Sequence, residues 1–451
     1  MEIDDKINIY QGPRGTAIRI LNRVERTDAY LDKLLDIELN RKEISDLDKG
    51  LLNEIVHGVI RWKNRLDWVI NGFYNGNYHK TEINLKNALR VAAYQILFLQ
   101  RIPNHAAVNE SVEFIKRLNG EKAANLVNAV LRNIIRNLAS IRYPEPEVDA
   151  VHYLSVYYSY PNWMVKRWLP RFGYEETEKL LIAYNQIPGI TIRINKMRCE
   201  PAKFLSILDA AAIQYHGSEY IDYYLKVTNL SALSDLNLFQ DGCFSIQDES
   251  AALPTMLLNL QPGERVIDLC AAPGGKTTHI AELMRNQGSI IAVDKYDYKL
   301  GLIKTSCERL GITIVDYKVS DAGELDDLPA DKVLADVPCS GLGVLRKKPD
   351  IKWKRDISDI NKLIGYQKSI LENAAKLTKP GGVIVYSTCT TEPEENMLLI
   401  QEFLKSHPEF SIDDASKYVN HELVNNSGCV ETFPHKHHMD GSFAVRLVKS
   451  S

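Results

Sequence analysis

Two cysteines, Cys339 and Cys389, each follow a segment that is predicted to form a β-strand. Cys339 lies in the run DVPCSG at residues 336–341, and Cys389 lies in the run STCTT at residues 387–391. A thiolate can attack a substrate and form a covalent intermediate, whereas a lone cysteine is more often a small buried hydrophobic residue. Because both cysteines stand at the end of a strand, we interpret them as a pair that acts in catalysis.

A glycine-bearing turn lies upstream of both cysteines. The run CAAPGGK at residues 270–276 follows a predicted strand and opens a predicted helix, so its backbone can approach a ligand closely. A Walker A loop would need a glycine at the position of Cys270, which excludes a P-loop NTPase. Asp294 lies 24 positions after Cys270, the offset expected for a carboxylate that binds the ribose of an adenosine-containing cofactor. On these features alone, a turn that binds no ligand remains the alternative.

The elements that must position these residues alternate between strand and helix from residue 241 onward. We expect strands at residues 266–269, 289–293, 312–316, 332–335 and 382–387, and helices at residues 277–285, 299–310, 361–377 and 394–406. This alternation predicts a parallel, doubly wound sheet. In such sheets ligands bind at the carboxyl ends of the strands, where both cysteines and the glycine turn are expected.

The first half of the chain is organised differently. Apolar residues recur at three- and four-residue spacing over residues 16–139, which predicts an all-helical domain. Two prolines in residues 142–148 predict a boundary near residue 145. Residues 153–171 mix aromatic and basic side chains, which suit stacked RNA bases and a small packed core equally well. An alternating segment at residues 191–195 predicts a strand, and we expect domains at residues 1–145, 146–240 and 241–451.

The composition of the chain excludes several classes of protein. With 451 residues, 45% of them hydrophobic and 25% charged, the chain is neither disordered nor fibrous. The net charge of −3 hides a formal charge of +7 over residues 51–200. The seven cysteines include no CxxC pair, so we expect no metal site and a reducing compartment. The acidic start of the chain and the absence of a long apolar run predict a cytoplasmic protein that does not span a membrane.

The paired cysteines meet the requirements of one difficult reaction. Carbon 5 of cytosine is a poor nucleophile, but a thiolate that adds at carbon 6 turns the ring into an enamine-like nucleophile that can attack an activated methyl group. A second group must then remove the carbon-5 proton so that the thiolate can leave. Asp336, three residues before Cys339, is positioned in sequence to bond the N3–N4 edge of the base.

These motifs resemble those of the RNA (cytosine-5)-methyltransferase family. The resemblance covers residues 241–451 through CAAPGGKT, DVPCSG and STC, the last followed by PEEN at residues 393–396. Residues 104–112 and 125–133 resemble the helical NusB-type RNA-binding fold. Together the two resemblances cover nearly the whole chain, and the motifs are highly specific.

The resemblance implies a multidomain architecture and a site. It implies an all-α NusB-like N-terminal domain, a small α+β linker domain that contacts RNA, and a C-terminal Rossmann-like, S-adenosyl-L-methionine-dependent methyltransferase domain. Cys389 would be the nucleophile, Cys339 would assist release, and Asp336 would lie between cofactor and base. The implied cofactor-binding residues are Cys270, Ala271, Ala272, Pro273, Gly274, Gly275 and Lys276, with Asp294 at the ribose, Asp321 at the adenine side, and Asp336.

The resemblance also implies a substrate, a cytosine of 16S ribosomal RNA, either naked or in an early small-subunit particle. We expect a monomer. We also expect residues 346–355, with a local charge of +5, to form a loop beside the active site that contacts RNA phosphates. A transfer-RNA cytosine methyltransferase is an alternative that the helical domain disfavours. A non-catalytic RNA-binding assembly or antitermination factor is another, which the two cysteines, the glycine turn and Asp294 disfavour.

Overall fold

The computed structural model describes residues 9–27, 29–41, 45–228, 233 and 236–451. The chain divides into two compact units, one of Met1–Asn185 with Lys347–Lys354, and one of Gln186–Arg346 with Arg355–Ser451. The division into three domains at residues 145 and 240 stays a prediction. The first eight residues, part of the acidic start on which the expectation of a cytoplasmic protein rests, lie outside the described residues.

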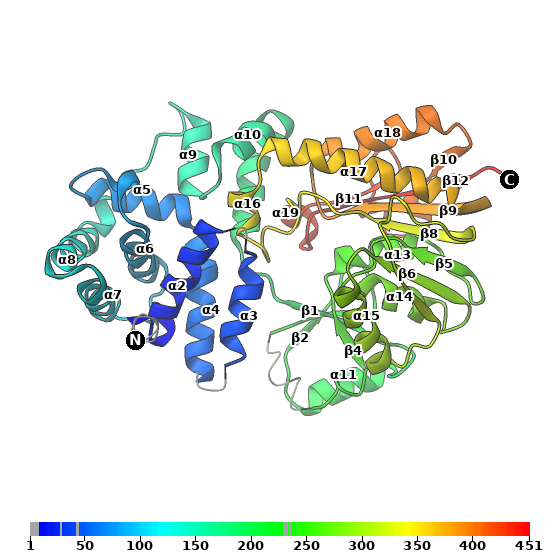
Figure 1. Cartoon of the computed structure of the whole chain (residues 1–451), viewed down its shortest axis with the longest axis horizontal. Helices are drawn as coiled ribbons and strands as arrows, with labels where there is room; N and C mark the ends of the chain where they lie inside the picture. The colour runs from blue at the N-terminus through cyan, green and yellow to red at the C-terminus, as the bar shows by residue number, and fades with distance from the viewer. Residues whose placement is uncertain (1–8, 28, 42–44, 229–232, 234–235) are drawn as a thin grey trace. The chain divides into compact units, whose positions relative to one another are not determined.

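The first unit is helical throughout its described residues (Figure 1). Its helices are α2 (Gly12–Arg26), α3 (Leu31–Leu39), α4 (Asp46–Arg61), α5 (Lys63–Phe73), α6 (Ile83–Phe98), α7 (Asn104–Asn119), α8 (Glu121–Arg136), α9 (Ala150–Tyr157), α10 (Asn162–Asn185) and α16 (Ile351–Lys354). Leu52 and Ile55 of α4 are fully buried in one core with Leu89 of α6, a helix that is buried on nearly all sides. The expected helical domain is confirmed.

A small antiparallel sheet begins the second unit. Its strands are β1 (Ile190–Ile194), β2 (Tyr215–Gly217), β3 (Tyr224–Val227) and β4 (Phe244–Ile246), in the order β2-β3-β1-β4. Helix α11 (Pro201–Ala210) packs on this sheet through Phe204, whose ring contacts Phe244 of β4. The strand expected at residues 191–195 is β1.

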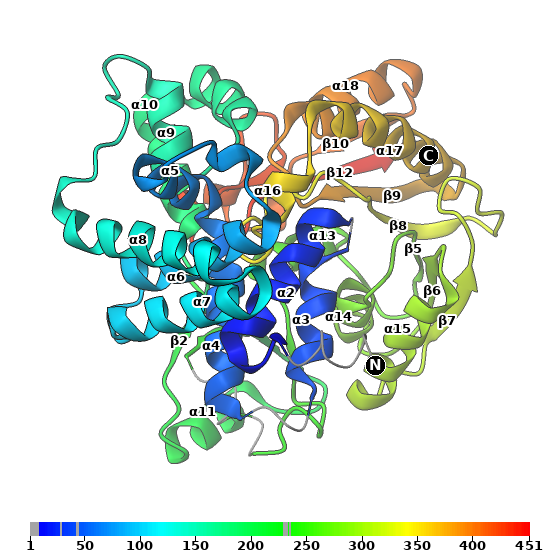
Figure 2. The same ribbon diagram turned by 60° about the vertical axis from the view of Figure 1, so that its left-hand side comes forward.

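The second sheet is larger and carries helices on both faces (Figures 1 and 2). Its order is β10-β12-β9-β8-β5-β6-β7, with β11 paired to β12. The strands are β5 (Arg265–Asp268), β6 (Ser289–Asp294), β7 (Val315–Val319), β8 (Ala330–Asp336), β9 (Thr378–Thr388), β10 (Phe410–Asp413), β11 (Val430–Thr432) and β12 (Ser442–Lys449). Strands β5 to β9 are parallel, as expected, while β10, β11 and β12 pair antiparallel.

Two separate layers of helix cover this sheet. One core includes residues of α13 (Leu253–Leu257), α14 (Gly275–Leu283) and α15 (Asp297–Leu310). The other includes residues of α17 (Ile357–Lys376) and α18 (Met397–Ser406). The doubly wound fold that the strand and helix alternation predicts is therefore confirmed. Among the described residues, no helix combines the length and apolarity required to cross a bilayer.

One expected strand lies in the wrong place. Residues 312–316 were expected to be extended, but β7 begins at Val315, which pairs with Ile290 of β6. Gly311 ends α15 in a left-handed conformation with φ of 72°, and Ile312 then packs into the core as part of the connection. The strand itself lies at the edge of the sheet and is largely exposed, so its apolar pattern is weak.

Candidate active site

The predicted site residues meet at one edge of the large sheet. Asp268 ends β5, Asp294 ends β6 and Asp336 ends β8, and these strands are parallel neighbours. Strand β9 lies beside β8 in the register that pairs Asp336 with Ser387, two residues before Cys389. The strand order reverses between β5 and β8, the position at which doubly wound sheets bind ligands.

The turn between β5 and α14 has the geometry of an anion-binding loop. Gly274 is the N-cap of α14 with φ of 104°, and a Cβ at this position would lie 3.1–3.2 Å from atoms of Ile303. Glycine is therefore required there. Because Gly274 provides no side-chain cap, the first N–H groups of α14 remain available to a negatively charged group.

Arg193, on strand β1 of the small sheet, supports this turn through hydrogen bonds to the start of α14. Its side chain is fully buried, and it donates to the carbonyl of Gly275 at 2.9 Å and to Thr278 Oγ1 at 3.1 Å. Its charge is paired with Glu282 of α14 at 2.8 Å. We did not predict this residue. The sequence offers one indication of its role, which is that Arg193 is a charged residue in a strand rich in isoleucine.

Asp336 is held by two partners. Lys276, the last residue of CAAPGGK, donates from Nζ to Asp336 Oδ2 at 2.6 Å, and Ser387 Oγ donates to Oδ1 at 2.7 Å. Burial lowers the pKa of Lys276, but the charge of Asp336 outweighs burial and the pKa is raised overall. The ammonium group therefore fixes the carboxylate at the end of β8.

Asp294 and Asp321 present two further carboxylates at the same edge of the sheet. Asp294 Oδ1 accepts the backbone N–H of Tyr296 at 3.0 Å. Asp321 Oδ1 accepts the backbone N–H of Gly323 at 3.0 Å and the hydroxyl of Tyr366 at 3.1 Å. Burial acts to raise the pKa of Asp321, but these hydrogen bonds and one from Lys295 prevail, so the pKa is lowered and the group is ionised at neutral pH. Sequence reasoning missed Tyr366.

The two cysteines are in contact. Cys339 Sγ lies 3.1 Å from Cys389 Sγ, and the backbone N–H of Cys389 points at Cys339 Sγ from 3.3 Å. Both are free thiols, and Cys389 is the more exposed of the two. The hydrogen bond to Cys389, together with burial, raises the pKa of Cys339 well above its ordinary value. Cys339 is therefore a neutral thiol next to an accessible second sulfur.

Glu395 holds the loop that carries Cys339. This residue belongs to the run PEEN and ends the short helix η4 (Pro393–Glu395). Its buried carboxylate accepts the backbone N–H of Ser340 at 2.8 Å, the Ser340 hydroxyl, and Gln367 Nε2 at 2.8 Å. Burial raises the pKa of Glu395 above its ordinary value. The loop after β8 is thus anchored at the residue adjacent to Cys339.

Asn396 holds the loop that carries Cys389. Its Oδ1 accepts the Thr388 hydroxyl at 2.6 Å, and its Nδ2 donates to the carbonyl of Thr390 at 3.0 Å. The side chain is 3% exposed. Both neighbours of Cys389 are therefore fixed, so the exposed thiol projects from a rigid turn. The sequence placed PEEN in the family pattern but gave no role to Glu395 or Asn396.

The expectation for residues 346–355 is wrong in part. Arg346 is 7% exposed and forms a salt bridge with Asp440 at 3.0 Å. Lys352 is 1% exposed, with Nζ donating to the carbonyl of Arg61 at 2.8 Å and lying 4.0 Å from the ring centre of Tyr160. Burial lowers the pKa of Lys352 well below its ordinary value. These two charges cannot contact phosphates, and Lys347–Lys354 is part of the helical unit.

The aromatic stretch at residues 153–171 contributes largely to packing. Tyr160 and Trp168 are 0% and 1% exposed and their rings meet edge to face. The guanidinium of Arg65 lies 4.3 Å from the ring centre of Tyr157. Of the two interpretations left open by the sequence, a packed core is the correct one for Tyr160 and Trp168.

The hydrogen-bond acceptors and donors at this edge of the sheet are of the kinds that can bind a nucleotide cofactor carrying an amino-acid group. Asp294 can accept hydrogen bonds from ribose hydroxyls, and Asp321 can accept one from an amino group of the base. The N-terminus of α14 suits a carboxylate. Among the described residues, no group of three or more His, Cys, Asp or Glu side chains could hold a metal ion. The fold and the site therefore define a cofactor-dependent enzyme of the doubly wound class.

Comparison with known families agrees with each part of the chain. Residues 255–448 match the family described as 16S rRNA methyltransferase RsmB/F. Residues 11–136 match the NusB family, and residues 160–232 match the ferredoxin-like domain of RsmF/B-like methyltransferases. The expected helical, small α+β and methyltransferase folds are thereby confirmed.

Individual relatives extend this similarity over the full chain. A probable ribosomal RNA small subunit methyltransferase B of Bacillus subtilis (strain 168) is 36% identical over 97% of this chain and 98% of its own length. The ribosomal RNA small subunit methyltransferase B of Yersinia enterocolitica is 34% identical over 91% of this chain and 92% of its own. The crystal structure of PH0851 matches 97% of this chain and 99% of its own with a TM-score of 0.78 and 27% identity.

A methyltransferase homologue from Pyrococcus horikoshii matches 67% of this chain and 99% of its own with a TM-score of 0.60 and 26% identity. The chain belongs to the RsmB/F family of 16S rRNA methyltransferases. As a member of that family it is an S-adenosylmethionine-dependent methyltransferase.

Proposed function

We propose that the chain transfers the methyl group of S-adenosylmethionine to carbon 5 of a cytosine in 16S ribosomal RNA, through a covalent bond between Cys389 and carbon 6. The observation that carries this proposal is the contact of 3.1 Å between the sulfurs of Cys339 and Cys389. Asp336 ends the strand that leads to Cys339, so an acidic group, a nucleophile and a second thiol lie at neighbouring strand ends.

The residues that would hold the cofactor are those of the glycine turn and the strand ends. Cys270, Ala271, Ala272, Pro273, Gly274, Gly275 and Lys276 form the turn and the start of α14. Asp294 would bind the ribose hydroxyls and Asp321 the adenine side, and both carboxylates already lie at the edge of the sheet. When bound, S-adenosylmethionine supplies an activated methyl group. The polar groups of the site support this assignment. The carboxylates can accept hydrogen bonds from the hydroxyls and the amine of the cofactor, and the N–H groups at the start of α14 can donate to its carboxylate.

Asp336 would orient the base. Its two oxygens are fixed by Lys276 and Ser387, and each oxygen retains a lone pair for the N3–N4 edge of cytosine. Hydrogen bonds from that edge favour the protonated ring, which accepts a thiolate more readily. The ion pair with Lys276 keeps the carboxylate in place before the base arrives.

Cys389 would make the first bond. Its thiolate attacks carbon 6, a sulfur–carbon bond forms, and the electrons of the 5,6 double bond pass to carbon 5. Carbon 5 then bonds to the methyl carbon, and the electron pair of the broken methyl–sulfur bond stays on the sulfonium sulfur. The target base must be unpaired or flipped out of its helix, because carbon 6 has to be open to the thiol.

Cys339 would complete the reaction by assisting removal of the carbon-5 proton. The hydrogen bond to Cys389 is the first cause of its raised pKa, and that bond is lost once the sulfur of Cys389 is attached to carbon 6. The backbone N–H of Cys389 still points at Cys339 and favours a negative charge there. When the carbon-5 proton leaves, its electrons re-form the 5,6 double bond and the Cys389 thiolate departs.

Ribosomal RNA as the substrate is supported by the family and by the names of the relatives. The match of residues 11–136 to the NusB family is in keeping with an RNA substrate, because those residues resemble a helical RNA-binding fold. A cytoplasmic location, a monomeric state and action on naked RNA or an early small-subunit particle remain predictions. The position of the target nucleotide depends on RNA shape and presentation.

Bisulfite sequencing of total RNA from a deletion strain tests the proposal. We expect one cytosine of 16S ribosomal RNA to lose its protection and to regain it on complementation with the unaltered gene but not with Cys389→Ala. Protection lost from a transfer RNA would instead assign the enzyme to the alternative substrate. Full methylation by Cys389→Ala would contradict the covalent mechanism.

A further inference from the structure

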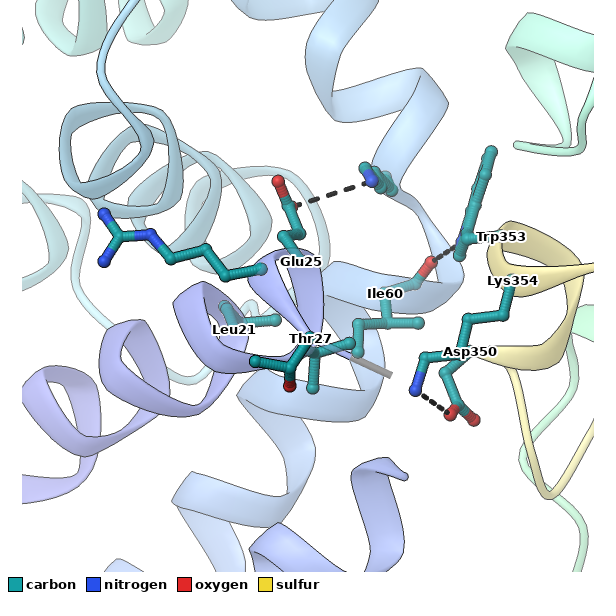
Figure 3. A pocket seen from close by; sticks show the side chains of 10 residues that line it. Leu21, Glu25, Thr27, Ile60, Asp350, Trp353 and Lys354 are labelled. Carbon is teal, nitrogen blue, oxygen red and sulfur yellow. Dashed lines mark hydrogen bonds and ion pairs between the residues drawn. The ribbon is translucent and has the colours of Figure 1, made fainter. Parts of the chain in front are cut away.

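The helical unit contains a cavity that the catalytic proposal does not use. Its volume is about 450 Å³. It is bounded by the end of α2, the junction of α4 with α5, and α16. Figure 3 shows residues from these elements around it, namely Leu21, Glu25, Ile60, Asp350, Trp353 and Lys354. Ligand pockets for small molecules typically measure 300–1,000 Å³, so the space suits one nucleotide.

An aromatic ring forms one wall of the cavity. The indole Nε1 of Trp353 donates to the carbonyl of Ile60 at 2.7 Å, which fixes the orientation of the ring. Trp353 is half-buried, and Lys63 Nζ lies 5.5 Å from its ring centre. A rigid, partly exposed indole next to a cation is the arrangement on which unpaired bases stack.

Cations outnumber carboxylates around this ring. Arg26, Lys63 and Lys354 line the cavity together with Glu25 and Asp350. Lys63 Nζ lies 3.6 Å from Glu25 Oε1, which also accepts from Arg90, and Lys354 Nζ lies 3.5 Å from Asp350 Oδ2 and also donates to the carbonyl of Ala29. Burial lowers the pKa of Lys63, with Glu25 offsetting part of the effect. A phosphate would offset the excess of positive charge among the residues that line the cavity.

A second aromatic platform lies beside the cavity. Tyr30 is 60% exposed, and its ring centre lies 5.4 Å from Lys354 Nζ and 6.0 Å from Lys33 Nζ. The ring of Tyr30 is thus an exposed aromatic surface between two lysines, on which a base can stack. Lys354 is shared between Tyr30 and the cavity, so a chain of nucleotides could follow from one to the other.

We propose that this cavity binds one unpaired nucleotide of the RNA substrate, with its base on Trp353 and its phosphate at Arg26 and Lys354. The neighbouring base stacks on Tyr30. Glu25 and Asp350 accept hydrogen bonds from an amino group or from the ribose 2′-hydroxyl, a group that DNA lacks. This inference rests on the proposed function for the identity of RNA as substrate. It assigns a second RNA contact, away from the reacting cytosine.

Photocrosslinking on the unaltered full-length chain tests the site directly. An unpaired oligoribonucleotide that contains 4-thiouridine is irradiated with the protein, and the crosslinked peptides are identified by mass spectrometry. We expect crosslinks to Trp353 or Tyr30, and weaker crosslinking with the oligodeoxyribonucleotide of the same sequence. Crosslinks that avoid both residues would overturn the proposal.

Variants give an independent measurement by fluorescence anisotropy. Arg26→Gln with Lys354→Gln should weaken RNA binding about tenfold or more and, because the two residues share one phosphate, lower the slope of log affinity against log salt by about 1. The control is Lys116→Gln with Lys122→Gln, which removes the same charge from α7 and α8. Equal affinity and slope in both double variants would overturn the proposal. Trp353→Phe, which keeps a ring, should bind more tightly than Trp353→Ala.

The catalytic proposal and this inference fail in different ways. Arg26→Gln with Lys354→Gln should raise KM for RNA and leave kcat at saturating RNA unchanged, since neither residue belongs to the catalytic machinery. A fall in kcat with unchanged KM would overturn the RNA-contact role. Failure of the catalytic proposal would appear as methylation by Cys389→Ala, a variant that should leave the crosslinks at Trp353 and Tyr30 unaltered.

Discussion

Glu395 and Asn396 are adjacent in the sequence, yet their side chains hold two different cysteine loops. Glu395 accepts the backbone N–H of Ser340 at 2.8 Å, whereas Asn396 accepts the hydroxyl of Thr388 at 2.6 Å. One dipeptide therefore anchors both the loop of Cys339 and the loop of Cys389, and so the separation of the two sulfurs. A change at either position should displace a thiol without removing any group that contacts RNA or cofactor.

Asn396→Ala should lower kcat by about 10- to 100-fold, because a small displacement of a reacting group costs that much in rate. KM for S-adenosylmethionine should stay unchanged, since the cofactor residues lie on other strands. The measurement is steady-state methyl transfer to RNA. Glu402→Gln, on the exposed face of α18, is the matched control and should behave as the unaltered enzyme. An Asn396→Ala enzyme with normal kcat would show that the turn around Cys389 needs no anchor.

Cys339→Ala should accumulate a covalent RNA–protein adduct. Attack by Cys389 and methyl transfer proceed without Cys339, but removal of the carbon-5 proton slows and the sulfur–carbon bond persists. The adduct is seen as a band of reduced mobility on a denaturing gel after incubation with cofactor and RNA. The double variant with Cys389→Ala should give no such band. An adduct that forms in the double variant, or normal turnover by Cys339→Ala, would contradict the assignment.

Asp294→Asn should weaken binding of S-adenosylmethionine by about 10- to 100-fold, because a hydrogen bond to a charged acceptor is worth roughly 1.5–3 kcal/mol. Calorimetric titration of the cofactor gives the dissociation constant without any need for turnover. Asp297→Asn, an exposed position at the start of α15, makes the same change in charge three residues away and should bind normally. Equal affinity in the two variants would exclude Asp294 from the cofactor site.

Asp268 should make stability depend on pH. Burial raises the pKa of this fully buried carboxyl from its ordinary value of 3.8 to about 7. Between pH 3.8 and about 7, Asp268 keeps its proton in the folded chain but releases it in the unfolded chain. The contribution of this carboxyl to the free energy of unfolding is therefore greatest at acid pH and is lost as pH rises through about 7. This shift in the pKa corresponds to a loss on the order of 4 kcal/mol in the free energy of unfolding.

Urea unfolding of Asp268→Asn at pH 5 and pH 8 measures this effect against the unaltered chain. Asparagine keeps an oxygen for the Thr277 hydroxyl, which donates to Asp268 at 2.7 Å, and it has no proton to release. The variant should therefore gain stability relative to the unaltered chain as pH rises. Asp316→Asn, at an exposed position of β7, should show no such gain. Parallel pH curves for the two chains would mean that Asp268 stays ionised when buried.

The fold could be predicted where local patterns determine it. Parallel strands β5, β6, β8 and β9 are short apolar runs between helices, and their order places their ends together whatever the details of the loops. This is why the sequence predicts that Asp294, Asp336 and the two cysteines lie at one edge of the sheet. The antiparallel strands β10, β11 and β12 were not predicted, because their pairing joins segments that are distant in sequence.

Side-chain support of the site could not be read from the sequence. Arg193 reaches α14 across a sheet boundary, and Tyr366 reaches Asp321 from α17, so neither contact is encoded by spacing. The prediction that residues 346–355 contact RNA phosphates was wrong in part for a related reason. A count of charges does not show which side chains are buried, and Lys352 is nearly inaccessible.

The eight residues Lys347–Lys354 also bear on how such a chain can evolve. They are encoded within the catalytic sequence but complete the interior of the helical unit, where Lys352 and Trp353 donate to the carbonyls of Arg61 and Ile60. A gene fusion that replaced one unit with an unrelated module would leave this segment without its binding partner. Recombination should therefore exchange residues 347–354 together with the N-terminal helices, and these two segments of the helical unit should co-vary at their contacts.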